Sequence, residues 1–74
     1  MAQLPALSAK QVIKNLNRLG FVRLRQKGSH LVMLNPKTRS RTVVPIHPGQ
    51  TIKKPLLQAI VNQAGVSVEE FLGQ

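Results

Sequence analysis

Two histidines are the side chains of this 74-residue sequence best suited to acid–base chemistry. His30 ends the stretch RQKGSH, and His47 lies in the stretch VPIHP. An imidazole changes its protonation near neutral pH and can move a proton in either direction. Ser29 offers a hydroxyl beside His30, but it stands in a predicted turn, Lys27-Gly28-Ser29. In that turn Gly28 supplies a positive φ. On spacing alone, both histidines are more often surface or loop residues than catalysts.

The acidic residues limit what other chemistry we expect. Glu69 and Glu70 are the only carboxylates, and both fall in the first turn of a predicted C-terminal helix, where negative charge complements the backbone dipole. Nucleases and polymerases that use Mg²⁺ need several carboxylates. The chain also has no cysteine, no set of acids beside its histidines that would hold zinc, and no GxxxxGK[ST] loop. We therefore expect neither a metal nor another cofactor.

The charge of the chain indicates its partners. Eleven Lys and Arg residues against two acidic residues give a net charge of +9. Such a field attracts polyanions, and a phosphate backbone is the natural one. The alternatives are an anionic membrane, an acidic protein, or a basic domain without a polyanionic partner. No apolar run approaches the length of a membrane span, and the N-terminus lacks a secretory signal, so we expect a cytoplasmic protein.

RNA is a polyanion that histidine and cations can cut without a metal. Its ribose 2′-hydroxyl is a nucleophile within the substrate itself. A protein needs only to remove that proton, to protonate the leaving 5′ oxygen and to neutralise the phosphate. One or two histidines with Lys or Arg suffice in principle. The products expected from this chemistry are a 2′,3′-cyclic phosphate and a 5′-hydroxyl.

Apolar spacing predicts the elements that must position these residues. Ser8 is a typical N-cap for the first helix, and Gly20 and Gly65 are typical C-terminal glycines for the two long helices. Pro45 marks the third strand as an edge strand or as bulged. The predicted elements are a helix over 9–19, strands over 21–26, 30–35 and 41–46, a helix over 54–64 and a short helix after Ser67.

This order predicts an α+β fold, α-β-β-β-α, with a three-stranded antiparallel meander, two helices on one face and a short C-terminal helix. Residues 1–7 are expected to be a loose lead-in to a single domain over 8–74. Period-two alternation places six apolar residues on the core face: Val22, Leu24, Leu31, Met33, Val44 and Ile46. The open face is then expected to hold Arg23, Arg25, His30 and His47, with Arg25 opposite His30 and Arg23 opposite Val32.

The stretch RQKGSH, from Arg25 to His30, resembles the signature of HicA-type toxins, the toxin half of a toxin–antitoxin pair. The similarity extends through LNRLGF, VPIHP and QAIVNQAGVSVEEFL, in the order and spacing of that family. The resemblance implies a double-stranded-RNA-binding-like fold, endoribonuclease activity on mRNA, arrest of translation and neutralisation by a HicB-type antitoxin. It also implies that His30 is the catalytic residue, that Gly28 and Ser29 form its supporting turn, and that His47 occupies a further recurrent position.

We therefore expect a metal-independent mRNA endoribonuclease in which His30 acts as general base or acid. The residues expected to bind RNA are Arg23, Arg25, Lys27, and Lys10 and Lys14 of the first helix. Apolar residues left on the open face, Val32, Leu34 and Val43, would contact an antitoxin or a second copy, in a hetero-oligomer or a homodimer. The rival is a non-catalytic module of the same fold, which binds duplex RNA by shape and does not need His30. A third alternative is a protein that binds anionic membranes.

Overall fold

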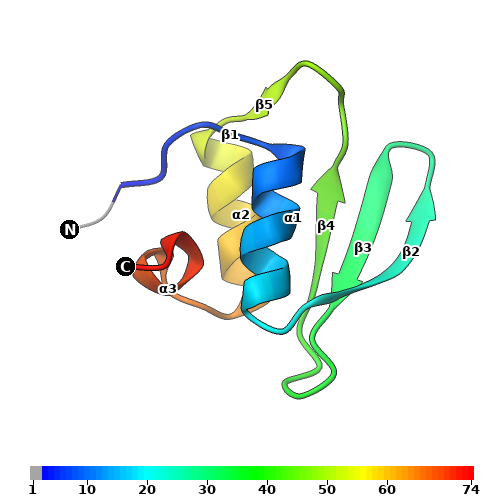
Figure 1. Ribbon diagram of the computed structural model, residues 1–74, viewed down its shortest axis with the longest axis vertical. Coiled ribbons are helices and arrows are strands. Elements are labelled where there is room, and N and C mark those ends of the chain that lie inside the picture. Colours follow the sequence, from blue (N-terminus) through cyan, green and yellow to red (C-terminus); the bar gives the residue numbers. More distant parts are fainter. Residues whose placement is uncertain (1–2) are drawn as a thin grey trace.

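A computed structural model describes residues 3–74. In chain order its elements are β1 (Leu7–Ser8), α1 (Ala9–Arg18), β2 (Val22–Lys27), β3 (His30–Leu34), β4 (Arg41–Pro45), β5 (Thr51–Ile52), α2 (Lys54–Ala64) and α3 (Val68–Leu72). Strands β2, β3 and β4 form an antiparallel sheet in that order, and β1 pairs with β5. The predicted α+β fold is confirmed. In Figure 1 the two long helices stand beside the sheet, with β4 nearest to them and β2 outermost.

Helix α1 begins and ends where local chemistry predicts. The Ser8 hydroxyl accepts a hydrogen bond from the Gln11 N–H, and the Gln11 side chain accepts one from the Ser8 N–H, both at 3.2 Å. This reciprocal pair is a capping box, which satisfies donors that a helix start otherwise leaves free. Gly20, with a φ of +99°, follows the last turn. The helix ends at Arg18, one residue before the predicted end.

Helix α3 is held against α1 by a charged side chain. The Arg18 guanidinium donates to the carbonyl oxygens of Glu70 at 3.0 Å and of Phe71 at 2.8 Å. A cation at these carbonyls complements the C-terminal end of a short helix. Phe71 itself is fully buried, and Val66 before the helix packs against the core. Arg18 therefore has a structural role.

The core lies between the helices and one face of β3 and β4. Leu31, Met33, Thr42 and Val44 alternate along these two strands and are at most 1% exposed. They meet the buried stripes of the helices, which are Val12, Ile13 and Leu16 of α1 and Leu57, Ile60, Val61 and Ala64 of α2. The Thr42 hydroxyl donates to Gln63 Oε1 at 3.0 Å, so the polar group in this layer is paired. The predicted core face is therefore confirmed for β3 and β4.

The core-face prediction is wrong for β2. Val22 is 49% exposed and Leu24 is 43% exposed. The register pairs Arg23 with Met33 and then Arg25 with Val32, so Leu24 is the additional residue of a β-bulge. Because side chains alternate between the faces of a strand, one additional residue moves each earlier residue of β2 to the face opposite to the predicted one. Strand β2 also lies beyond the helix layer, so neither of its faces is buried (Figure 1).

The N-terminal segment was expected to be a loose lead-in, but its described part packs on the domain. Leu4 is only 7% exposed and belongs to the core, and Leu7 pairs with Ile52. Strands β1 and β5 have two residues each, too few for alternation to reveal them. Residues 1 and 2 of that lead-in lie outside the described residues. In the described part of the chain, no helix combines the length and apolar character that a bilayer span needs.

We predict that Ser67→Ala lowers the free energy of unfolding by about 1 kcal/mol, because it removes the N-cap of α3. The Ser67 N–H, and to a smaller extent its hydroxyl, hold the pKa of Glu70 below its usual value. The stability that this carboxylate contributes is therefore present above the usual pKa and is lost as the pH falls through the lowered pKa. Urea denaturation at a series of pH values, with NMR titration of the Glu70 carboxyl, measures both effects.

Glu69→Gln is the matched control, since it removes a charge from the same turn and leaves the capping box intact. The interpretation fails if Ser67→Ala changes neither the stability nor the titration of Glu70.

Candidate active site on the open face of the sheet

His30 is the first residue of β3, the central strand of the sheet. It therefore has a cross-strand neighbour on each side, Lys27 of β2 and Pro45 of β4. Paired residues of antiparallel strands project from the same face. The alternation along β3 places His30 on the face opposite to buried Leu31, and its side chain is exposed. An imidazole and an ammonium group thus stand in adjacent positions on the open face.

The turn before His30 is a two-residue hairpin loop. Lys27 pairs with His30, which leaves Gly28 and Ser29 to connect the strands. Gly28 has a φ of +58° and Ser29 has no positive φ, the combination found in type II′ turns. The Gln26 side chain donates to the Gly28 carbonyl at 3.1 Å, and the Ile46 N–H donates to the Ser29 carbonyl at 2.6 Å. Both loop residues are therefore held by neighbouring strands.

The cross-strand partners differ from those that the sequence predicts. Arg25 was expected opposite His30, but it pairs with Val32, and Lys27 takes the position beside His30. The reason is the length of the loop, which has two residues, Gly28 and Ser29, whereas Arg25 opposite His30 would leave four. Arg23 was expected on the open face opposite Val32. It instead pairs with Met33, on the face that carries the core, because the bulge at Leu24 exchanges the faces.

The open face consists of three cross-strand rows. The register gives Lys27–His30–Pro45, Arg25–Val32–Val43 and Val22–Leu34–Arg41. Cations occupy the β2 end of two rows, and apolar side chains fill the centre. Arg41 is a further cation of this face and was not among the predicted RNA-binding residues, although its pairing with Leu34 follows once the β3–β4 register is known. The three apolar residues expected on this face, Val32, Leu34 and Val43, do lie there.

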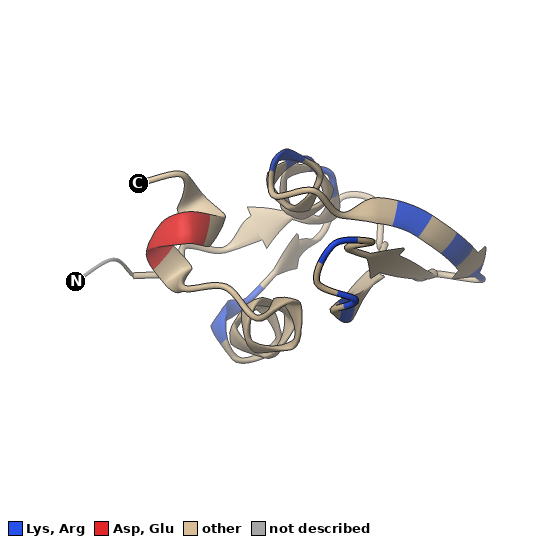
Figure 2. Ribbon diagram, turned by 90° about the horizontal axis from the view of Figure 1, so that it is seen from below, with Lys and Arg blue, Asp and Glu red and all other residues tan. Residues whose placement is uncertain are grey.

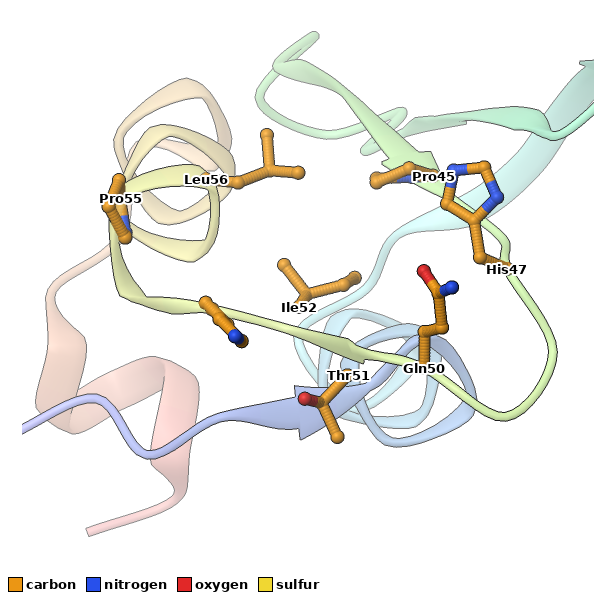
Figure 3. A pocket seen from close by; sticks show the side chains of 8 residues that line it. Pro45, His47, Gln50, Thr51, Ile52, Pro55 and Leu56 are labelled. Carbon is orange, nitrogen blue, oxygen red and sulfur yellow. The ribbon is translucent and has the colours of Figure 1, made fainter.

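His47 lies at the same end of the sheet as His30. Ile46 bonds to Ser29, so the next residue, His47, continues past the end of the β3–β4 ladder. Its ring stands beside Pro45 at one side of a pocket of about 360 Å³ (Figure 3). The lining residues come from β4, the following loop, β5 and the start of α2: Pro45, His47, Gln50, Thr51, Ile52, Lys53, Pro55 and Leu56.

Pro45 connects this pocket to His30, because it neighbours His30 across the strands and also lines the pocket. Across the pocket, the Leu56 side chain projects from α2 toward Pro45 (Figure 3). The pocket was not predicted from the sequence, because its residues come mostly from a loop and a helix start. No periodic pattern marks such residues.

The remaining charges lie elsewhere. Lys10 and Lys14 are exposed on α1 and are not part of the open sheet face. Figure 2 shows the basic bands of β2 at one end of the molecule and the acidic turn of α3, which holds Glu69 and Glu70, at the other. Both carboxylates are therefore distant from His30. Acid–base chemistry at the open face would have to come from imidazole and cationic groups.

The family model described as HicA toxin of bacterial toxin-antitoxin systems matches residues 9–66. This range runs from the first residue of α1 to just past the end of α2. It includes the three strands of the sheet, both histidines and the whole lining of the pocket. A comparison with curated proteins finds no match.

We predict that Gly28→Ala destabilises the protein by about 1–2 kcal/mol, although no atom lies within 4 Å of the position that a Cβ would take. The cost comes from the positive φ, which an L-alanine side chain disfavours. Gly28→Asn is the matched control, because asparagine tolerates such turn positions better. Equal unfolding free energies for the glycine and alanine proteins in urea denaturation would contradict the turn geometry.

Proposed function

The chain belongs to the HicA toxin family of bacterial toxin–antitoxin systems, and from this premise we propose that it is an endoribonuclease that cuts mRNA without a metal ion and so arrests translation. The observation that carries the proposal is the adjacent pair of Lys27 and His30 on the open face. A group that moves protons and a group that neutralises phosphate stand next to each other there. Both can be reached by a large ligand, since both side chains are exposed.

In the proposed reaction, one imidazole removes the proton of the ribose 2′-hydroxyl, and the 2′ oxygen forms a bond to phosphorus. The bond from phosphorus to the 5′ oxygen breaks, and that oxygen receives a proton. The products are a 2′,3′-cyclic phosphate and a 5′-hydroxyl. His30 is one of the two proton-transfer groups, and His47, at the same end of the sheet, is the candidate for the other. Lys27 stabilises the charge that develops on the phosphate.

A toxin of this family implies a cognate antitoxin. We place the contact with a HicB-type antitoxin on the apolar centre of the open face, at Val32, Leu34 and Val43. Val43 is 38% exposed, and the other two are partly exposed. A protein that covers these side chains removes apolar surface from water and lies over the rows next to His30. Because the substrate is mRNA, the proposed site of action is the cytoplasm.

We predict that His30→Ala lowers the rate of RNA cleavage by about 10²–10⁴-fold, the usual contribution of a general acid or base. The affinity for RNA should stay within a few-fold, because the cations remain. Cleavage is measured with a labelled transcript in the presence of EDTA, and affinity by fluorescence anisotropy. Expression of either protein in growing cells gives a second readout, since only the wild-type protein should stop growth.

Three results would reject this mechanism: equal cleavage by His30→Ala, cleavage that depends on added Mg²⁺, or a wild-type protein that binds RNA and never cuts it. The last result would identify the protein as an RNA-binding module. The urea midpoint of His30→Ala is the control for folding. We expect it to equal that of the wild type, because the His30 side chain is exposed.

We predict that Arg25→Ala weakens the productive binding of RNA more than Arg23→Ala does. The two arginines are two residues apart on β2, but only Arg25 lies on the face of His30. Each phosphate contact that is lost should reduce the slope of log affinity against log salt by about 0.7 for single-stranded RNA. Titrations of labelled RNA at several salt concentrations measure this slope. Equal effects of the two substitutions would show that RNA does not follow the open face.

A further inference from the structure

We infer that the pocket beside Pro45 binds one unpaired nucleobase of the RNA substrate, next to the phosphate that is cut. This inference rests on the endoribonuclease function proposed above and adds a substrate class to it. The ligand is single-stranded RNA, and the pocket selects among its bases.

The pocket lies next to the proposed catalytic residue. Pro45 is the cross-strand neighbour of His30 and also a wall of the pocket. Adjacent strands lie about 4.8 Å apart, so the pocket begins one strand spacing from the backbone of His30. A nucleotide whose phosphate lies at His30 therefore has its neighbouring base within reach of the pocket. His47 lines the pocket beside Pro45 (Figure 3).

The shape and chemistry of the pocket suit a nucleobase. Its volume of about 360 Å³ is near the lower end of small-molecule sites, which range over roughly 300–1,000 Å³. Ile52, Pro55 and Leu56 supply apolar surface for the faces of a base. The Gln50 amide, which in Figure 3 points toward Pro45 and His47, has both donors and an acceptor for the edge of a base.

Cations stand at both ends of the path from His30 to the pocket. Lys27 stands on one side of His30, and Lys53 lines the pocket on the other side. Lys53 is also the N-cap of α2, where the positive end of the helix dipole adds to its charge. A chain that lies across the strands from Lys27 to Lys53 therefore meets cations on both sides of the bound base. A chain of phosphates fits this arrangement better than an apolar peptide segment.

An unpaired base is required because a base in a duplex has its edge occupied and its faces stacked. Removing it from the duplex costs energy before the pocket can hold it. The site therefore favours single strands and loops, although shape-based duplex binding is common for proteins of similar fold.

The test fills the pocket with Leu56→Trp. Leu56 is 48% exposed, so the larger side chain can occupy the pocket without entering the core. Binding is measured on the His30→Ala background, by anisotropy with a labelled single-stranded RNA. We expect about tenfold weaker binding, the scale of losing one stacked base. In the active protein we expect KM to rise by a similar factor while kcat changes little. Asn62→Trp, on an exposed part of α2 outside the pocket, is the matched control and should change neither.

Gln50→Ala is the second variant, because Gln50 is exposed and its loss does not threaten the fold. We expect it to change which nucleotides flank the cut bonds, as mapped by sequencing the 5′-hydroxyl ends. A fully paired RNA should be cut at least tenfold more slowly than its single strand. Unchanged binding by Leu56→Trp, equal cleavage of paired RNA, or a Leu56→Trp protein that loses only antitoxin binding would overturn the inference.

The two proposals fail separately. If the wild-type protein does not cut RNA, but Leu56→Trp still weakens the binding of single strands, the pocket binds a base and the catalytic proposal falls. If His30→Ala abolishes cleavage while Leu56→Trp binds and cuts as the wild type does, the catalytic proposal stands and the pocket inference falls.

Discussion

The hydrogen bond from the Ile46 N–H to the Ser29 carbonyl extends the β3–β4 ladder to the residue just before His30. On the other side, the two-residue loop at Gly28 fixes the pairing of Lys27 with His30. The first residue of β3 is thus held from both strands. A slip of one residue on either side would move His30 to the helix face of the sheet or exchange its neighbours. The position of the imidazole therefore depends on register, and register depends on these backbone contacts.

Pro45 can stand beside His30 because β4 is an edge strand. In an antiparallel ladder, bonded and non-bonded pairs alternate. Since Ile46 donates to Ser29, the His30–Pro45 pair is a non-bonded one, and the missing N–H of the proline faces away from β3. The absence of an N–H on Pro45 therefore removes no hydrogen bond from the β3–β4 ladder. It also leaves the outer edge of β4 with one donor fewer and gives the pocket an apolar wall.

The sequence was sufficient for those features that local chemistry determines. The caps Ser8 and Ser67 located the starts of two helices, and alternation located the buried faces of β3 and β4. The bulge at Leu24 could not be read from the sequence, because neither glycine nor proline marks it and a leucine there looks like a core residue. Tertiary position decided the rest: β2 lies beyond the helices, so its apolar residues stay exposed. The bulge is also the reason that Arg23 was assigned to the wrong face.

In the candidate site, too, some features follow from local sequence and others only from the tertiary structure. His30 and His47 could be chosen from the sequence, since few other groups there can move protons and the resemblance singles out the same residues. That Lys27 is the neighbour of His30 depends on the length of the hairpin loop, and a sequence does not state that length. The pocket brings together a strand end, a loop, a two-residue strand and a helix start. These residues come together only when the whole chain has packed, so no local sequence pattern predicts the pocket.

The two faces of the sheet differ in composition, and this difference explains how a small chain with so many cations keeps a stable core. One face of β3 and β4 is completely apolar apart from Thr42, and the helices cover it. The cations stay on β2, on exposed helix positions and at the rim of the open face, where water screens them. The centre of the open face is apolar, so in the proposed function the phosphates would follow its β2 side and edge row, past Arg25 and Lys27 to His30. An antitoxin on the apolar rows would then compete with RNA by covering the row beside it, without having to contact the imidazole.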